Sequence, residues 1–568
     1  MVLGERSGIS SQLKEIFKRT NTLHILAISG LHLGIIALII VSVLRFFIVT
    51  KRKVFVVTIF FLIVYSWLVG FRPSITRTLI MVLVFLIGRV VYREGNGLNT
   101  LSLAAVVILL FDPLALFNMG FQLSFSIVLF LILFTPYIEQ NLQKFFLKGY
   151  LYKPKDKKYY FWVKCFKFLA GCIAAQLASL PLMSYYFNLF SPVSLLANMV
   201  VIVFLYPILL LGFLTLILGL ISKTLLLWLT TVNFCFLKGM IITIKALSLI
   251  PFSFFYVPAI SGVAVIGYYI LIGLFLKERY RRLAAIGLFL GGIFLFLAPY
   301  WKEKAPQVIF FDVGKGESTL ISVNRGKHIL IDCGSSSKEE VGRNVILPYL
   351  RAEGINCLEA VIVSHFHDDH CNGLFTLIED IRIKNVFIVK KEEPFYLQEI
   401  LVKKMKEKGI KVVEVNSQDQ GETLSSNLGI EVLSPPKELF YSSSTHLREN
   451  DNSMVCRLEI GACSFLFCGD VELKGMKYLS QKGEMLKSLV VKVPHHGGKS
   501  SFSKSFYELV KPEIAVICTN KKISKEVRDF FKKSPIRMFK TGDTGAIMIT
   551  VEKEKCRVET MQKKDEAA

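Results

Sequence analysis

The feature that most constrains the fold is a series of apolar runs from Leu23 to Pro299, which contain few charged residues. Each run approaches the roughly 20 residues that an α-helix needs to cross the hydrocarbon core of a bilayer. We therefore predict a polytopic α-helical membrane domain with about ten helices. The predicted segments lie near residues 24–44, 54–70, 76–93, 99–116, 119–138, 165–187, 193–220, 224–248, 258–276 and 282–299.

From Trp301 onward the sequence alternates short apolar runs with charged stretches, as soluble α/β domains do. A chain of 568 residues is long enough for more than one domain. We predict an N-terminal interfacial segment at residues 1–22, a transmembrane domain at 23–300 and a soluble domain at 301–568.

Basic residues follow every odd-numbered predicted segment: Lys51–Lys53, Arg89 and Arg93, the loop from Lys144 to Lys167, Lys223, and Lys277–Arg282. Basic loops favour the cytoplasm, so we expect the N-terminus and the soluble domain to be extracytoplasmic. The formal net charge of +24 fits this positive-inside excess. It fits equally well an anionic partner such as nucleic acid or lipid headgroups.

The 11 cysteines form no CxxC pair and no spacing typical of a disulfide scaffold. Several lie in predicted core strands, among them Cys456, Cys463 and Cys468, and there we predict that they serve core packing. So many cysteines are unusual for an extracytoplasmic domain. The charges of the loops nevertheless favour an extracytoplasmic location of the soluble domain more strongly.

Polar side chains within the apolar runs are costly and therefore informative. The candidates are Arg72, Arg77, Gln122, Gln176 and Asn198. Hydrogen bonding between helices is the favoured explanation for any one of them. Together they could line a polar passage, in which Arg72 and Arg77 would contact a polyanion through their planar guanidinium groups.

A candidate metal motif follows the apolar run from Leu358 to Val363, which we predict to be a buried strand. The pattern is H-x-H-x-D-H, formed by His365, His367, Asp369 and His370. Imidazole and carboxylate are ligands that zinc and manganese accept. We predict that His365 and His367 serve one metal and that Asp369 and His370 serve a second.

Other predicted strands end in similar side chains. Asp470 follows one strand and suits a bridging carboxylate, and His495 and His496 follow another. We expect one of these two histidines to bind metal and the other to touch substrate, with His496 preferred as the ligand. Asp332 ends an upstream strand and would orient a ligand from behind, and we expect the same of Asp312 and Asn452.

From about Gln307 to Val551 the sequence resembles the metallo-β-lactamase superfamily, through His365–His370, Gly469-Asp470 and His495-His496. The resemblance implies an αββα sandwich that holds two divalent ions. Further blocks are similar to the ComEC family of competence proteins: His24–His32, Arg72–Met81, Gly120–Phe125, Ala175–Ala178 and Phe311–Ser318. That resemblance implies an inner-membrane channel that brings single-stranded DNA into a naturally competent bacterium.

The sequence departs from this family in several places. Lys315 and Glu317 stand where Gln and Asp are usual, and the superfamily's third histidine of the first metal site has no clear counterpart. His446 lies nearby, and we predict it to be a loop residue. Family members usually carry a further N-terminal region with membrane helices and a small β-barrel, which we expect this chain to lack.

We expect hydrolysis of phosphodiesters, with Asp369 as metal ligand and proton acceptor and His495 near the leaving group. Lys492 and Lys499 would hold flanking phosphates or be solvated surface residues. DNA, membrane lipids and a DNA receptor are expected partners. An ATP-driven motor is expected as a separate partner, because the sequence contains no P-loop. Assembly of the chain into a homo-oligomer is a further expectation. Two alternatives remain: a membrane-anchored hydrolase of lipid or cell-wall phosphoesters, and a transporter whose soluble domain is an inactive docking module.

Overall fold

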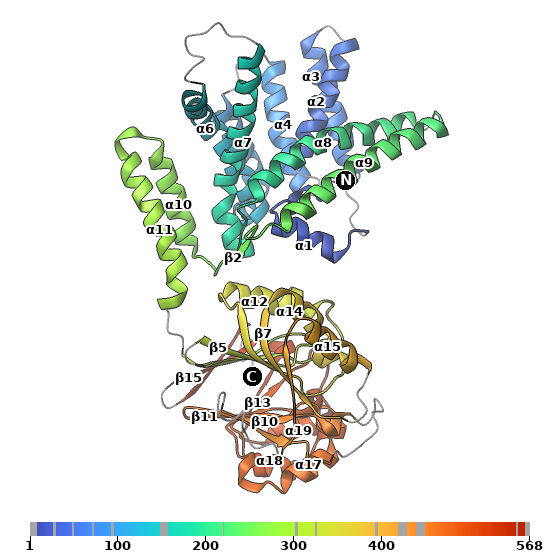
Figure 1. Cartoon of the computed structure of the whole chain (residues 1–568), viewed down its shortest axis with the longest axis vertical. Coiled ribbons are helices and arrows are strands. Elements are labelled where there is room, and N and C mark those ends of the chain that lie inside the picture. The colour runs from blue at the N-terminus through green and yellow to red at the C-terminus, as the bar shows by residue number, and fades with distance from the viewer. Residues whose placement is uncertain are drawn as a thin grey trace. The chain divides into compact units, whose positions relative to one another are not determined.

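A computed structural model describes the chain except for residues 1–7, 27–29, 48–49, 71–72, 92–95, 148–156, 220, 302–304, 324–325, 392–395, 418–428, 439–448, 553–554 and 563–568. The predicted channel residue Arg72 and the loop residue His446 lie outside the described residues. The chain forms two compact units, Met1–Ile293 and Phe294–Ala568, which we describe separately. Figure 1 colours both along the chain.

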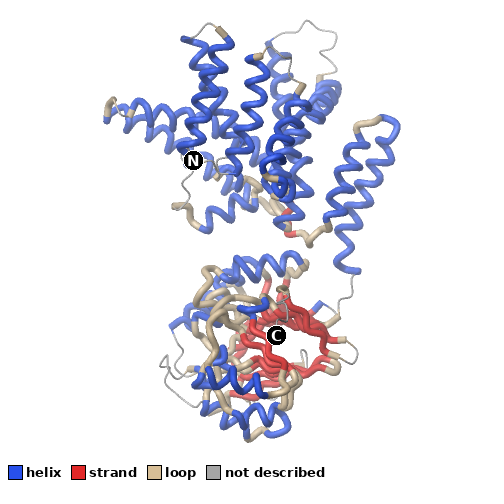
Figure 2. Tube along the Cα trace, turned by 180° about the vertical axis from the view of Figure 1, so that it is seen from behind, coloured by secondary structure: helices blue, strands red, loops and turns tan. Residues whose placement is uncertain are grey.

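The first unit is helical apart from two short strands (Figure 2). Its amphipathic first helix is α1 (Ser11–Arg19). The following ten helices overlap the ten predicted segments one for one, which confirms the predicted fold class: α2 (Gly30–Phe47), α3 (Lys51–Leu68), α4 (Pro73–Val90), α5 (Gly97–Phe111), α6 (Met119–Phe146), α7 (Lys157–Phe187), α8 (Ser194–Leu218), α9 (Lys223–Ser248), α10 (Gly262–Phe275) and α11 (Arg281–Trp301). Helix α11 continues past the boundary between the units.

Length and apolar composition make five of the described helices able to cross a bilayer: α2, α6, α7, α8 and α9. These helices turn many apolar side chains outward, while a smaller set packs between them. Phe17, Leu205 and Met240, from α1, α8 and α9, meet in one such buried cluster. A helix that is apolar on all sides is stable in lipid, because lipid covers the outward face.

The second unit contains two sheets. The eight-stranded sheet has the order β16-β15-β3-β4-β5-β6-β7-β8, with bounds β3 (Gln307–Phe310), β4 (Thr319–Val323), β5 (Lys327–Ile331), β6 (Cys357–Ile362), β7 (Arg382–Val389), β8 (Lys411–Val415), β15 (Ile547–Val551) and β16 (Cys556–Thr560). The six-stranded sheet has the order β14-β13-β12-β11-β10-β9, with bounds β9 (Ile430–Ser434), β10 (Val455–Ile460), β11 (Cys463–Phe467), β12 (Val490–Lys492), β13 (Ile514–Ile517) and β14 (Arg537–Lys540).

The two sheets pack face to face around a core that includes Phe310, Phe387 and Phe465. Alternation along a strand sends successive side chains to opposite faces: Ile329 and Ile331 enter this core, whereas Leu330 points to the helices. Helices α12 (Leu347–Ala352), α14 (Leu374–Asp380) and α15 (Tyr396–Glu407) cover one sheet, and α17 (Leu473–Ser480), α18 (Lys504–Val510) and α19 (Lys525–Lys533) cover the other (Figure 1). This is the predicted αββα sandwich.

A disulfide joins the two sheets between Cys463 in β11 and Cys556 in β16. Cys463 is buried in the core as predicted, and its disulfide is an additional contact that the sequence analysis did not predict. The spacing of the cysteines in the sequence did not indicate this disulfide, because the two residues are 93 positions apart. Cys456 and Cys468 are free and buried, as predicted.

Candidate metal centre

Parallel strand pairing gathers the predicted site residues at one edge of the sandwich. Strands β5 and β6 run parallel, and so do β11 and β12. Their carboxyl ends lead into Asp332, Ser364-His365, Asp470 and His495-His496, respectively. Asp332, His495 and His496 have φ values of 56°, 46° and 53°, in the left-handed region. Such strained backbone is common where side chains must be aimed at a functional site.

The side chains of the candidate ligands converge. The rings of His365 and His367 meet, with Nε2 of the first 3.0 Å from Nδ1 of the second. His370 Nε2 lies 3.3 Å from Asp470 Oδ1. His496 Nε2 lies 3.7 Å from both Asp369 Oδ2 and Asp470 Oδ2. Asp470 thus lies beside His370 and His496, and its carboxylate also groups with His365.

The donor set fits a divalent cation. His370 Nε2, His496 Nε2 and Asp470 Oδ1 are buried and have no hydrogen-bond partner among the described residues. Buried polar atoms without partners are costly, and a shared cation is the usual reason for a converging set. Three overlapping groups have ligand atoms within 4.8 Å of one another: His365-His370-Asp470, Asp369-His370-His496 and Glu317-Asp332-His370.

Polar groups behind the ligands fix which nitrogen faces the cluster. Asp332 Oδ2 lies 2.8 Å from His370 Nδ1, and Asp332 Oδ1 accepts the Ser364 N–H at 2.7 Å. His496 Nδ1 donates to the Cys518 carbonyl oxygen at 2.8 Å. Because the Nδ1 atoms are engaged, the Nε2 atoms of both rings point into the cluster, as metal-binding histidines require.

The two adjacent histidines differ in place. His496 is buried, with Nε2 facing two carboxylates. His495 is 32% exposed, and its Nδ1 lies 3.0 Å from Glu472 Oε1 while its Nε2 lies 3.8 Å from Asp470 Oδ2. This geometry favours His496 as the ligand and leaves His495 at the open side.

Charge in the cluster is mutually stabilised. Burial alone would lower the pKa of His370, but Asp470 and Asp332 outweigh it and hold that pKa well above its usual range. Burial opposes ionisation of Asp470, yet His370 and His496 hold its pKa well below its usual range. The buried imidazole and carboxylates of the cluster therefore stabilise one another's charged forms.

The structure gives Lys492 surroundings that the sequence analysis did not predict. Lys492 is fully buried, contacts Glu317 Oε2, and places Nζ 2.7 Å from the Gly469 carbonyl oxygen and 3.6 Å from Asp470 Oδ1. The two expectations for Lys492, a phosphate contact or a solvated surface, were therefore wrong. The available signal was its place in the apolar run Leu489–Val493, since a parallel central strand is buried on both faces.

A second buried ion pair supports the metal motif from behind. Lys391 Nζ lies 2.5 Å from Glu449 Oε1, which also accepts the Phe366 N–H at 3.2 Å. Glu449 follows the segment 439–448, which lies outside the described residues. The sequence offered no signal for this pair, because the partners are 58 residues apart.

The two other predicted supporting residues, Asp312 and Asn452, lie in different surroundings from each other. Asp312 pairs with Lys338 at 3.2 Å and accepts the Gly314 N–H at 3.1 Å, so its described contacts are with the loop and not with a ligand. Asn452 is buried next to Ser453, whose Oγ lies 3.5 Å from His365 Nδ1. Lys499 is exposed and pairs with Glu526 at 3.0 Å.

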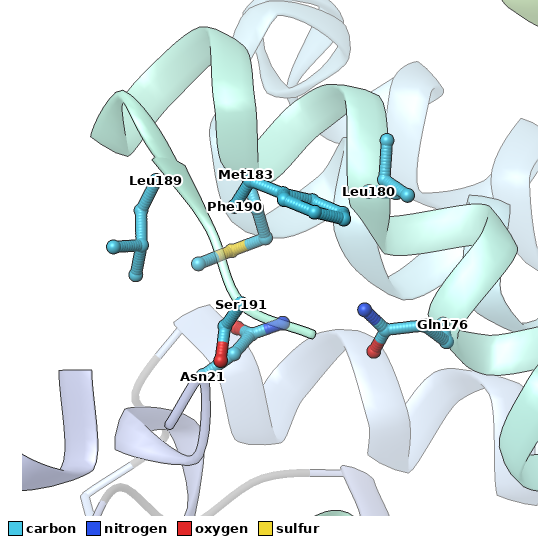
Figure 3. Close-up of a pocket in the computed structure, with 7 residues that line it drawn as sticks. All are labelled: Asn21, Gln176, Leu180, Met183, Leu189, Phe190 and Ser191. Atoms are coloured by element: carbon cyan, nitrogen blue, oxygen red, sulfur yellow. The ribbon is translucent and has the colours of Figure 1, made fainter. Parts of the chain in front are cut away.

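The polar residues of the helical unit have separate local surroundings. The guanidinium of Arg77 packs so closely on Gly120, at the start of α6, that a Cβ there would collide with it. Gln122 Oε1 accepts the Tyr186 hydroxyl at 2.9 Å. Gln176 lines a small pocket beside Asn21 and Ser191 (Figure 3). Asn198 is half-buried in α8. The polar passage stays a prediction.

The fold and the donor set define a class: a membrane protein with a metallo-β-lactamase-type domain of the metal-dependent hydrolase kind. Residues 1–282 match the family model described as competence protein, and residues 312–520 match the metallo-β-lactamase superfamily. The chain belongs to the family of competence proteins that combine these two domains. Membership supports a role in DNA uptake, and the second domain implies binding of divalent metal.

The chain is similar to two curated relatives over most of its length. It is 27% identical to ComE operon protein 3 of Bacillus subtilis, over 96% of this chain and 70% of the relative. It is also 27% identical to Recombination protein 2 of Haemophilus influenzae, over 92% of this chain and 66% of the relative. The metallo-β-lactamase fold protein YhfI from Bacillus subtilis is 12% identical, with a TM-score of 0.28, over 41% of this chain and 96% of YhfI.

Proposed function

We propose that this protein is a multi-pass inner-membrane channel that passes single-stranded DNA, while its C-terminal domain hydrolyses phosphodiesters of the other strand. The convergence of six histidine and aspartate side chains at one edge of the sandwich carries this proposal. The family model and a relative named as a recombination protein support DNA as the substrate.

Two ions, zinc or manganese, would occupy the cluster. His365 and His367 would hold one and Asp369, His370 and His496 the other, with Asp470 between them. When bound, such ions lower the pKa of water and neutralise charge that develops on phosphoryl oxygens. The buried atoms of His370, His496 and Asp470 without hydrogen bonds support the second of these two positions.

The protein's own residues would manage the protons. Burial disfavours the charged form of Asp369, but His496 outweighs it and holds the pKa of that carboxyl well below its usual range. Asp369 is therefore ionised at neutral pH, as a metal ligand must be. A carboxyl this acidic is a weak base, so its proposed role as proton acceptor is supported by its position in the cluster and not by its pKa. The hydrogen bond with Glu472 raises the pKa of His495, so this imidazole keeps a proton that it can give to the leaving oxygen.

The helical unit would provide the passage. Arg72, Arg77, Gln122, Gln176 and Asn198 are the proposed lining residues, and sequence-independent contacts of basic groups with phosphates would be sensitive to salt. The C-terminal domain would face the outside of the membrane. The disulfide supports this orientation, because disulfides persist in oxidising compartments. A DNA receptor, an ATP-driven motor and self-association are proposed as partners.

The test uses the full chain in detergent micelles, stripped of metal and then loaded with zinc or manganese. End-labelled duplex and single-stranded DNA are incubated with the protein, and products are separated by size. The proposal expects metal-dependent cleavage that His370→Ala abolishes. It fails if DNA stays intact with either metal while the same preparation hydrolyses an unrelated phosphoester.

A further inference from the structure

A rigid turn presents one lysine at the mouth of the metal centre. Gly314 and Gly316, on either side of Lys315, have φ values of 79° and 158°. The Lys315 N–H donates to Ser337 Oγ at 2.7 Å, and the Lys315 carbonyl oxygen accepts the Ser336 N–H at 2.8 Å. A Cβ on Gly316 would collide with the carbonyl oxygen of Gly334. The backbone of this turn therefore has little freedom to move.

The same turn is joined to the metal motif. The N–H of Glu317, two residues after Lys315, donates to the Asp369 carbonyl oxygen at 2.9 Å. The Cys333 N–H donates to the His370 carbonyl oxygen at 2.7 Å, from the adjoining loop. The position of Lys315 is thus tied through backbone hydrogen bonds to two of the proposed ligands.

The Lys315 side chain faces the cluster and is still open to solvent. Its Nζ lies 3.8 Å from Asp369 Oδ2, and the side chain is 39% exposed. Two other lysines near the site differ in this respect. Lys492 is sealed in the interior against Glu317, and Lys499 is 79% exposed and pairs with Glu526. Lys315 alone of these three combines a contact with a proposed ligand and access to an incoming molecule.

The spacing suits a second anionic partner. At 3.8 Å the ammonium and the Asp369 carboxylate are an ion pair longer than a direct hydrogen bond. An ammonium on a flexible stem carries three donors, so it can keep this attraction and also donate to another oxygen. Asp369 itself would be occupied by metal, which weakens its hold on Lys315.

We propose that Lys315 binds a non-bridging phosphate oxygen of the nucleic-acid strand in the site. This inference rests on the proposed hydrolysis of DNA. Lys315 contributes to substrate binding. The charge that develops on the reacting phosphate would be stabilised by the ligand cluster and not by Lys315. Its removal should therefore act on KM more than on kcat.

The experiment compares the full-length wild type with Lys315→Gln, Lys315→Arg and Lys384→Gln in the same micelles. Lys384 is the control, because it also carries one positive charge, pairs with Glu359 at 2.7 Å, and lies near the beginning of β7, away from the carboxyl ends of the strands. Steady-state hydrolysis of a single-stranded oligonucleotide is measured over a range of salt, with bound metal quantified for each variant.

We expect K315Q to raise KM about 10–100-fold, the range of one charge-assisted hydrogen bond, with kcat changed far less. The salt dependence of log kcat/KM should become shallower by about 0.7, as expected for one phosphate contact on a single strand. K315R should keep most of the affinity, K384Q should match wild type, and the metal content of all four proteins should agree.

The inference is overturned if K315Q matches K384Q in KM and in salt slope, or if its defect follows a loss of bound metal. If the wild type cleaves no oligonucleotide, fluorescence anisotropy with the same oligonucleotide decides separately. Tighter binding by wild type than by K315Q then upholds the phosphate contact while the proposed hydrolysis fails. Equal binding overturns the contact as well.

Discussion

The two units of this chain treat large apolar side chains in opposite ways. In the helical unit Phe46, Trp67 and Phe111 are largely exposed. In the sandwich unit Phe310, Phe465 and Phe506 are completely buried. One hydrophobic effect explains both, because apolar groups leave water either for a protein core or for lipid. The difference shows that the surroundings of each unit, and not its apolar content, decide which face of an element is polar.

Polar residues differ between the units in a parallel way. In the sandwich unit the ends of parallel strands bring side chains that are distant in sequence within hydrogen-bonding range of one another. In the helical unit the polar side chains do not converge in this way: Gln122 bonds Tyr186, and Gln176 lies beside Asn21 and Ser191. A sheet edge concentrates functional groups at one place, whereas helices distribute them along their length.

The largest effect should come from removing a group of the convergent cluster. His370→Ala leaves the Asp332 and Asp470 carboxylates facing each other without the imidazole. We expect metal-dependent hydrolysis by the full chain to fall by more than about a hundredfold, since groups behind a ligand alone cost about 10–100-fold. Bound metal should fall in parallel, as measured by elemental analysis.

His328→Ala is the matched control, because His328 lies in β5 of the same unit and bonds Ser322 at 3.0 Å. It should keep activity within a few-fold. DNA uptake that survives His370→Ala unchanged would favour a docking role for the domain over a nuclease.

A pair of leucines tests the comparison of the two surfaces directly. Leu38 lies in the middle of α2 and is 56% exposed, and Leu473 begins α17 and is 59% exposed. If α2 lies in lipid, Leu38→Asp should cost about 3 kcal/mol of membrane insertion. Leu473→Asp faces water and should change stability by less than about 0.5 kcal/mol.

Membrane-integrated protein after alkaline extraction measures the first substitution, and thermal unfolding measures the second. Equal tolerance of both substitutions would contradict the view that α2 faces lipid.

The disulfide offers the next largest effect. Replacing Cys463 and Cys556 together by alanine removes the link between the sheets, and should destabilise the sandwich unit by about 2–4 kcal/mol. The measurement is denaturant unfolding followed by a probe in the sandwich, with and without reductant. Cys456→Ala provides a buried cysteine without a bridge. Unfolding of the wild type that is indifferent to reductant would argue against a disulfide that stabilises the fold.

Sequence patterns predicted the features that depend on neighbours along the chain. Hydropathy is local, so the ten helical segments could be located before any packing was known. The motif from His365 to His370 is also local, and strand ends at Asp332, Asp470 and His496 follow from apolar runs that stop at a polar residue.

Features that depend on tertiary contacts were not predictable. The pairs Glu449–Lys391 and Cys463–Cys556 join residues 58 and 93 positions apart, and nothing in the residue types identifies the partner. The predicted surroundings of Lys492 were wrong for a related reason. A lysine is nearly always exposed, and Lys492 is buried against Glu317, which lies in the loop between β3 and β4, far away in the sequence.

The smallest of these effects should come from the residue behind the ligands. Asp332→Asn keeps the size of the side chain and its hydrogen bond from the Ser364 N–H at Oδ1, but removes the negative charge that faces His370 Nδ1. We expect metal affinity to fall about 10–100-fold while the fold is retained. The dissociation constant is measured by competition with a chelating dye.

Asp312→Asn is the matched control, since Asp312 carries the same charge but pairs with Lys338 at the loop surface. It should change metal affinity by less than the scatter of the assay. The ranking of the two aspartates thus tests whether the sandwich unit concentrates its function at the strand ends. If Asp312→Asn weakened metal binding as much as Asp332→Asn, the loop would belong to the site, and the contacts of Asp332 with Ser364 and His370 would not explain the orientation of the ligand.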